Sequence, residues 1–136
     1  MSRERNIEAV RQGIEAFNRR DFDTAMALAR DDVTWARFLS RSEADDPLVR
    51  GKEELRAVWE SQVEAVDIRL EPEEFIEAGD DKVIVPTVMV ARGSGSEITL
   101  SASVTWAWTF DEGGLIARVD AFETKAAACT AAGLPE

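Results

Sequence analysis

The sequence of 136 residues contains no histidine, no tyrosine and a single cysteine, Cys129. Without histidine there is no serine–histidine–aspartate triad and no imidazole proton shuttle, and without tyrosine no phenol can stabilise an oxyanion. One cysteine forms no intramolecular disulfide, and with no histidine beside it a zinc site of nitrogen and sulfur ligands is excluded. Acid–base chemistry therefore falls to Asp, Glu, Lys or water, and we expect no cofactor and no metal.

Basic residues are few and long apolar runs are missing. The 16 basic residues against 27 acidic residues give a net charge of −11, which opposes nucleic-acid backbones and anionic lipid headgroups. No apolar run approaches the ~18 residues of a membrane span, and the N-terminal residues lack the apolar core of a secretory signal. We expect one domain over residues 1–136, located in the cytoplasm, that binds neither nucleic acid nor membranes.

Helical patterns fill the first half of the chain. An apolar stripe at helical spacing predicts a helix over residues 3–19, and Asp21 resembles the N-cap of a short helix that ends near residue 32. A strand is predicted over residues 33–38 and a polar loop, containing Asp46-Pro47, over residues 40–49. A second long amphipathic helix follows Gly51 and runs to about residue 65.

The second half of the chain is predicted to form a meander of antiparallel strands. Strands are predicted over residues 68–77, 82–92, 97–110 and 115–125, with turn residues between them and a last helical turn over residues 126–132. Strand 97–110 is far longer than the usual ~5–6 residues, so it must bend, and Pro86 marks a bulge or an edge in its neighbour. These patterns predict an α+β fold: a curved antiparallel sheet with helices on its concave face, enclosing a cavity.

The strand over residues 83–92 is apolar on both faces, which predicts that both are covered. Helices cover only one face, so a second copy of the chain is expected on the convex face, giving a homodimer. The alternative is burial beneath the C-terminal segment. The two rows are Val83, Val85 and Met89 on one face and Ile84, Val88 and Val90 on the other.

The last hairpin carries the candidate site, and its loop allows two registers. If Gly113 closes a three-residue loop, Phe110 pairs with Gly114, and the tryptophans share a face with Ile116, Arg118, Asp120 and Phe122. If the loop has four residues, Phe110 pairs with Leu115, and the tryptophans share a face with Ala117, Val119 and Ala121. We favour the first register because Gly113 suits its bulge.

Several strings resemble the SnoaL-like and ketosteroid-isomerase-like branch of the nuclear transport factor 2-like superfamily. They are residues 16–23, Asp31-Asp32-Val33-Thr34-Trp35, Arg50-Gly51-Lys52-Glu53 and the hairpin from Phe110 to Ala121. The resemblance extends over nearly the whole chain and implies a cone-shaped ligand pocket. The superfamily includes isomerases, polyketide cyclases, epoxide hydrolases, dehydratases and binding modules, so the fold does not select an activity.

Asp120 is the candidate general base or acid, and it falls where the resemblance places a pocket aspartate of SnoaL-like cyclases. An apolar wall penalises a charged carboxylate and thereby suits it to proton transfer. The alternative is an ion pair with Arg118, which would make Asp120 structural. A steroid isomerase of this fold uses a tyrosine that this chain lacks, and no second pocket acid is found for an epoxide hydrolase.

Aromatic residues are expected to line the cavity as walls for a ring-shaped ligand, although core packing explains each of them as well. These residues are Trp35, Trp59, Trp106, Trp108 and Phe122. Arg37 shares a face with Trp35 and is expected either to hold a ligand carboxylate or enolate, or to lie in solvent at the strand end.

The sequence thus predicts a pocket protein for a small hydrophobic ligand. The preferred activity is isomerisation or cyclisation of a hydrophobic carbonyl compound with Asp120 as the base. The alternative is a non-catalytic binding or sensing module of the same fold, and a third possibility is a structural dimer whose cavity is filled by its own side chains.

Overall fold

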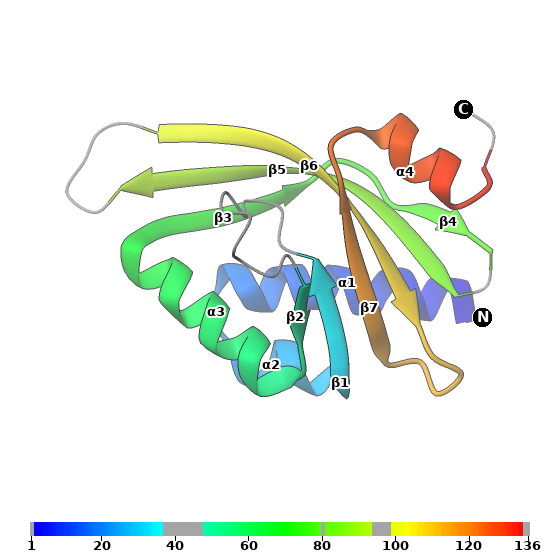
Figure 1. Ribbon diagram of the computed structural model, residues 1–136, viewed down its shortest axis with the longest axis horizontal. Coiled ribbons are helices and arrows are strands. Elements are labelled where there is room, and N and C mark those ends of the chain that lie inside the picture. Colours follow the sequence, from blue (N-terminus) through cyan, green and yellow to red (C-terminus); the bar gives the residue numbers. More distant parts are fainter. Residues whose placement is uncertain (1, 37–47, 80, 94–98, 135–136) are drawn as a thin grey trace.

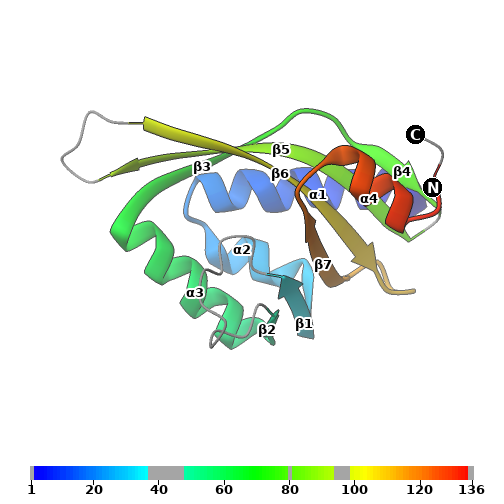
Figure 2. The same ribbon diagram turned by 45° about the horizontal axis from the view of Figure 1, so that its top comes forward.

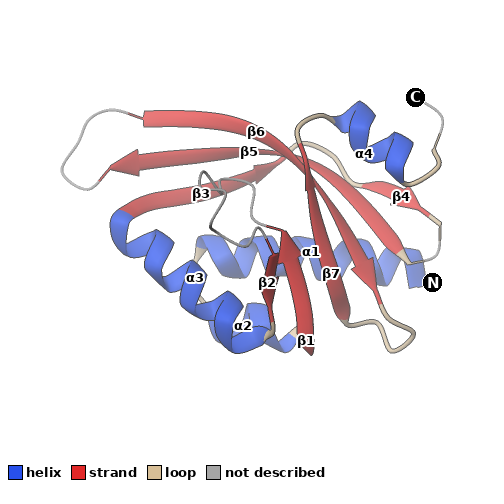
Figure 3. Ribbon diagram, in the orientation of Figure 1, coloured by secondary structure: helices blue, strands red, loops and turns tan. Residues whose placement is uncertain are grey.

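The structure, a computed structural model, describes residues 2–36, 48–79, 81–93 and 99–134. Within these described residues, four helices and seven strands follow one another (Figures 1 and 3). Their order is α1 (Ser2–Asn18), α2 (Phe22–Ala27), β1 (Ala29–Ala36), β2 (Leu48–Arg50), α3 (Lys52–Ala65), β3 (Val66–Pro72), β4 (Ile76–Ala78), β5 (Lys82–Gly93), β6 (Thr99–Phe110), β7 (Ile116–Phe122) and α4 (Lys125–Ala131).

The strands form one curled sheet in the order β2-β1-β7-β6-β5-β3, with β4 paired to β5. The sheet is mixed rather than antiparallel as predicted, because β1 runs parallel to β7. The two strands lie far apart in the sequence, and a parallel pair needs a long connection of this kind. Helices α1, α2 and α3 lie on the concave face, and the architecture is the predicted α+β fold (Figure 1).

The helices begin and end where local hydrogen bonds direct them. Asp21 caps α2: its carboxylate accepts from the backbone N–H of Thr24 at 3.3 Å and from the Thr24 hydroxyl at 2.7 Å. The helix ends at Ala27, earlier than predicted, because Ala29 already pairs with Ile116 in the sheet. No helix in the described part of the chain is long and apolar enough to cross a membrane.

Pro86 lies at a break in the pairing of β5. On one side β5 pairs with β4 at Ile84 and then with β3 from Thr87 onward, while its pairing with β6 continues without a shift. A proline has no N–H to donate, so it fits the position between two partner strands. Residues 73–75 of the partner lie opposite only two residues of β5, Val85 and Pro86, and the Glu73 N–H donates to the Pro86 carbonyl at 2.8 Å. Of the two expected roles, the bulge is therefore the one observed, since β5 lies between β6 and β3 inside the sheet.

The convex face is covered at one end by α4. Ile84 and Ala107 of the sheet pack against Ala128 and Cys129 of that helix, and all four are buried. The predicted alternative, burial beneath the C-terminal segment, is thus confirmed for this part of the face, where a second copy is not the cover. Thr124 caps α4 by accepting from the Ala127 N–H at 3.0 Å.

Candidate functional site

The register of the last hairpin differs from the one we favoured. Trp108 pairs with Val119 and Trp106 with Ala121, so the concave row of β7 is apolar. Asp120 pairs with Ala107 and Arg118 with Thr109, which places both charged residues on the convex face. The favoured three-residue loop is therefore wrong, and the faces follow the second register.

The loop itself explains the difference. The Asp111 carboxylate accepts from the backbone N–H groups of Gly113 and Leu115, both at 2.9 Å, and Gly114 rather than Gly113 has positive φ, at 85°. Phe110 then pairs with Ile116, and a bulge follows. One extra residue in a strand moves every later side chain to the opposite face.

Asp120 and Arg118 form an ion pair. The Arg118 Nε lies 2.8 and 3.0 Å from the two carboxylate oxygens of Asp120, and the arginine side chain is 57% exposed. This is the structural alternative given for Asp120, and the structure confirms the pair. Phe122 also faces the convex side, opposite Thr105, and packs against the cluster under α4.

The four tryptophans, in contrast, lie together on the concave face. The Trp35 ring is 5.2 Å from the rings of both Trp59 and Trp108, with interplanar angles of 87° and 86°, and 5.9 Å from the ring of Trp106. Such edge-to-face contacts are favourable between aromatic quadrupoles. Phe17 extends the cluster, 5.3 Å from Trp59. Strands β1 and β6 and helix α3 thus bring one set of aromatic walls together.

Two indole N–H groups in this cluster have no hydrogen-bond acceptor among the described residues. Trp106 is 4% exposed and Trp108 is 3% exposed, yet neither indole Nε1–H has a hydrogen-bond acceptor in the part of the chain that the structure describes. A buried donor without an acceptor costs about 1–3 kcal/mol. Buried donors in native proteins are nearly always paired with protein or with ordered water, so an acceptor is expected beside these two indoles.

The space beside the cluster is narrow and apolar. A cavity of about 20 Å³ lies among residues that include Gly13, Trp35, Leu55, Trp59 and Trp108. The buried polar residues of the described chain are Asn6, Thr87 and Thr105, and no charged residue is among them. The side chains therefore nearly fill this space, and a larger ligand would have to displace some of them.

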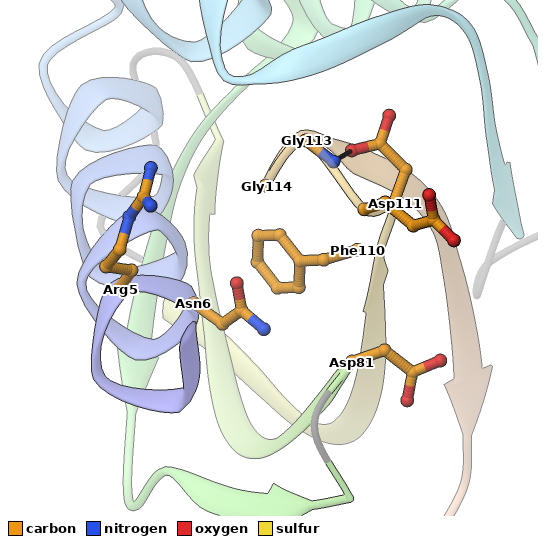
Figure 4. Close-up of a pocket in the computed structure, with 8 residues that line it drawn as sticks. Arg5, Asn6, Asp81, Phe110, Asp111, Gly113 and Gly114 are labelled. Carbon is orange, nitrogen blue, oxygen red and sulfur yellow. Dashed lines mark hydrogen bonds between the residues drawn. The ribbon is translucent and has the colours of Figure 1, made fainter. Parts of the chain in front are cut away.

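A second, wider hollow of about 510 Å³ lies between the start of α1 and the β6–β7 loop (Figure 4). Phe110 forms its floor, Arg5 and Asn6 come from α1, and Asp81, Asp111, Glu112, Gly113 and Gly114 complete it. The N–H groups of Gly113 and Gly114 are both occupied by Asp111. Three carboxylates against one guanidinium make this hollow unsuited to the hydrophobic ligand expected from the sequence.

Of the predicted site residues, Arg37 lies outside the described residues, as does most of the loop over residues 40–49. Val119 and Ala121, which the sequence analysis placed on the tryptophan face only in the second register, complete the concave wall beside Trp108 and Trp106. Their signal was present: Ala117, Val119 and Ala121 alternate with polar residues, which is typical of a strand with one buried face.

The family model of the SnoaL-like domain matches residues 10–119. The chain belongs to this family. The resemblance predicted from the sequence is therefore confirmed. None of the curated proteins matches the chain.

Solved structures of the same fold include three informative neighbours of this SnoaL-like chain. RV0760c from Mycobacterium tuberculosis, in complex with estradiol-17beta-hemisuccinate, has a TM-score of 0.76 and 18% identity over 90% of this chain and 95% of that chain. The Δ5-3-ketosteroid isomerase from Mycobacterium sp. has a TM-score of 0.75 and 17% identity over 90% and 95%. The epoxide hydrolase/cyclase-like enzyme SalBIII, with a role in pyran ring formation in salinomycin, has a TM-score of 0.73 and 17% identity over 93% and 96%. These likenesses show the nuclear transport factor 2-like fold.

Proposed function

We propose that this SnoaL-like protein binds a small, neutral, hydrophobic molecule that carries a hydrogen-bond acceptor, on the concave face among its four tryptophans. The observation that carries the proposal is the pair of buried indole N–H groups of Trp106 and Trp108, for which the described residues supply no acceptor. A ligand carbonyl placed against them would recover the free energy that these donors lose by burial.

The chemistry of the cluster restricts the ligand. Indole nitrogens only donate, so the matching ligand atom is an acceptor such as a carbonyl or ether oxygen. The nearby Thr87 hydroxyl already donates to the carbonyl of Val85 at 3.0 Å. No charged side chain is buried in the described chain, and an unpaired charge is costly to bury, so acids and amines fit poorly.

The structural neighbours support the class of ligand, and a ligand of steroid size would have to displace side chains that now nearly fill the space of about 20 Å³. One neighbour was crystallised with a steroid ester and another is named for its action on ketosteroids. The flat polycyclic ring system common to both would match the aromatic walls formed by Trp35 and Trp59, and a neutral ketone as in a ketosteroid would supply the acceptor.

Isomerisation or cyclisation with Asp120 as the base is the second candidate, and the enzymes among the neighbours favour it. This activity would require Asp120 to reach the concave face. The carboxylate instead lies on the convex face in an ion pair with Arg118. We therefore place binding or sensing ahead of catalysis.

A homodimer and a cytoplasmic location remain part of the proposal. With α4 over Ile84, the part of the convex face that a second copy could cover contains Val88 and Val90, both partly buried.

The test is equilibrium dialysis of the protein against progesterone, a neutral ketone. The control ligand is pregnane, the same ring system without oxygen. Binding of the ketone with at least tenfold preference over the hydrocarbon is expected, since each lost hydrogen bond to a buried donor costs about 1 kcal/mol or more. Equal affinity for both ligands would contradict a role for the indole donors.

Matched variants locate the site. Trp106→Phe and Trp108→Phe keep an aromatic ring but remove an unpartnered donor, and each should weaken ketone binding by about fivefold to tenfold. Trp59→Phe removes an indole whose nitrogen is not one of the two buried unpartnered donors, and it should change the preference for the ketone little. An equal loss of preference in all three variants would indicate general damage to the cluster.

A further inference from the structure

Gly13 is an unexpected residue for its place in the fold. It is buried in the interior of α1, well before the helix ends at Asn18. Glycine destabilises a helix interior relative to alanine, because its backbone loses more conformational freedom on folding. A glycine at this position therefore needs a reason in the structure.

The two usual reasons for a glycine do not apply to Gly13. Positive φ is found at four other glycines of the described chain, whereas the backbone of Gly13 is helical. Close packing does not exclude a side chain either. A Cβ atom on Gly13 would lie 3.7 Å from Leu28 Cδ1, which is an ordinary van der Waals distance, and α1 apart, no other described residue comes within 4 Å of it. Alanine therefore fits at this position.

Gly13 lines the narrow cavity beside the tryptophan cluster. The cavity of about 20 Å³ is shared with Trp35, Trp59 and Trp108, and Figures 1 and 2 show α1 crossing the concave face of the sheet behind β7. A space of this size holds about one water-sized group. Because a Cβ atom on Gly13 would have a single close neighbour, a methyl group there would take up unfilled space. The missing side chain thus keeps this space open.

The same cavity has an unsatisfied donor in its wall. Trp108 is 3% exposed, and its indole N–H has no acceptor among the described residues. An oxygen atom that reaches this N–H brings the rest of its molecule into the space beside Gly13. The backbone of α1 cannot turn aside as a side chain can, because Val10, Ile14 and Phe17 fix this part of the helix in the core. Residue 13 therefore limits how much of a ligand fits there.

We propose that Gly13 determines the size of ligand that the tryptophan cluster accepts. Its missing side chain admits a ketone of several fused rings, whereas alanine at this position admits only a smaller ring system. The inference rests on the proposed function and adds a specificity-determining residue to it. In the ligand-free protein α1 is less stable than it would be with alanine, and a ring of the bound ketone takes the place of the missing side chain.

Gly13→Ala tests the inference with two measurements on the full chain. In the ligand-free protein, alanine should raise the melting temperature by about 2–4 °C, because it favours the helix and fits beside Leu28. In equilibrium dialysis, the variant should bind progesterone, which has four fused rings, roughly tenfold or more weakly than the natural protein, since overfilling a packed site is costly. Binding of trans-1-decalone, a ketone of two fused rings, should change by less than about threefold.

Ser61→Ala is the matched control. Ser61 is exposed in the interior of α3 and is not among the residues that line the cavity. Alanine there also favours a helix, so it should raise the melting temperature slightly and leave the binding of both ketones unchanged. The control separates the loss of space at residue 13 from the effect of a more stable fold.

Three results would overturn the inference and leave the proposed function in place. They are full progesterone binding by Gly13→Ala, an equal loss of both ketones in that variant, and a lowered melting temperature, which would give the glycine a role in packing. A natural protein that binds neither ketone would instead overturn the proposed function, and the inference with it.

Discussion

The two faces of the β6–β7 hairpin are made from the same two strands and differ in every respect that matters for chemistry. On the concave face, Trp106, Trp108 and Val119 are at most 4% exposed. On the convex face, Arg118 and Asp120 form an ion pair in contact with solvent. A candidate acid therefore needs more than the right strand. The conformation of the loop determines which face of the sheet the acid occupies. Only an acid on the concave face can exchange a proton with a ligand bound there.

The largest effect is expected from placing a carboxylate on the concave side. Val119 has no exposed surface, so Val119→Asp buries a charge with no partner. We expect a loss of about 4 kcal/mol or more in the free energy of unfolding, or a failure to fold. Urea denaturation followed by circular dichroism measures it, with Val119→Ala as the control for lost volume. A well-folded Val119→Asp variant would mean that this position faces water.

Ile84 tests whether α4 makes the convex side a true core at one end. The side chain has no exposed surface and lies under Ala128 and Cys129. Ile84→Ala should lower the free energy of unfolding by about 2–3 kcal/mol, near the lower end for buried isoleucines because the cluster is small. The matched control is Val88→Ala, on the same face beyond α4, where chemical denaturation should show less than half of this loss.

Asp120→Ala should have a small effect on stability, because the partner Arg118 is mostly exposed and such ion pairs contribute about 0–1 kcal/mol. Ketone binding by dialysis should be unchanged within about twofold. If this variant instead lost binding or an isomerase activity while keeping its melting temperature, Asp120 would reach the ligand and catalysis would take precedence over binding.

The smallest effect concerns the attachment of α4. The Lys125 Nζ lies 2.7 Å from a Glu74 carboxylate oxygen, and this hydrogen bond raises the pKa of Lys125 above its ordinary value. Because the pKa of Lys125 is higher in the folded than in the unfolded protein, the charged lysine stabilises the fold. This stabilisation is complete below the pKa of the unfolded state, about 10.4, and is lost as the pH rises through the pKa of the folded state.

The melting temperature of the natural protein should therefore exceed that of Lys125→Gln at pH 8. The difference should shrink as the pH passes above the raised pKa. A gap that stays constant over this range would show that Lys125 acts through packing and not through charge.

The contrast between the faces also shows what the sequence could predict. Helices α1 and α3 and the long strands β5 and β6 were recognised because each repeats its apolar residues over many positions. The face of Asp120 depended on a single local event, the bonding of the Asp111 side chain to Gly113 and Leu115. The sequence pattern that recorded this face was the short alternation of Ala117, Val119 and Ala121, which the choice of loop outweighed. The parallel pairing of β1 with β7 was missed because it joins segments that are distant in the sequence. The four tryptophans were expected on one face and do lie together, because β6 alternates and Trp35 and Trp59 lie on elements that face it, whereas Phe122, expected with them, lies on the convex face.

The tryptophan cluster has an optical consequence. All four tryptophans of the chain are in this one cluster and there is no tyrosine elsewhere, so the near-ultraviolet emission of the protein comes from a single place. Rings separated by 5.2–5.9 Å exchange excitation, so the indoles report as a coupled set. Any molecule that enters the concave face will change the emission without a label, whereas events at the convex face will leave it unchanged.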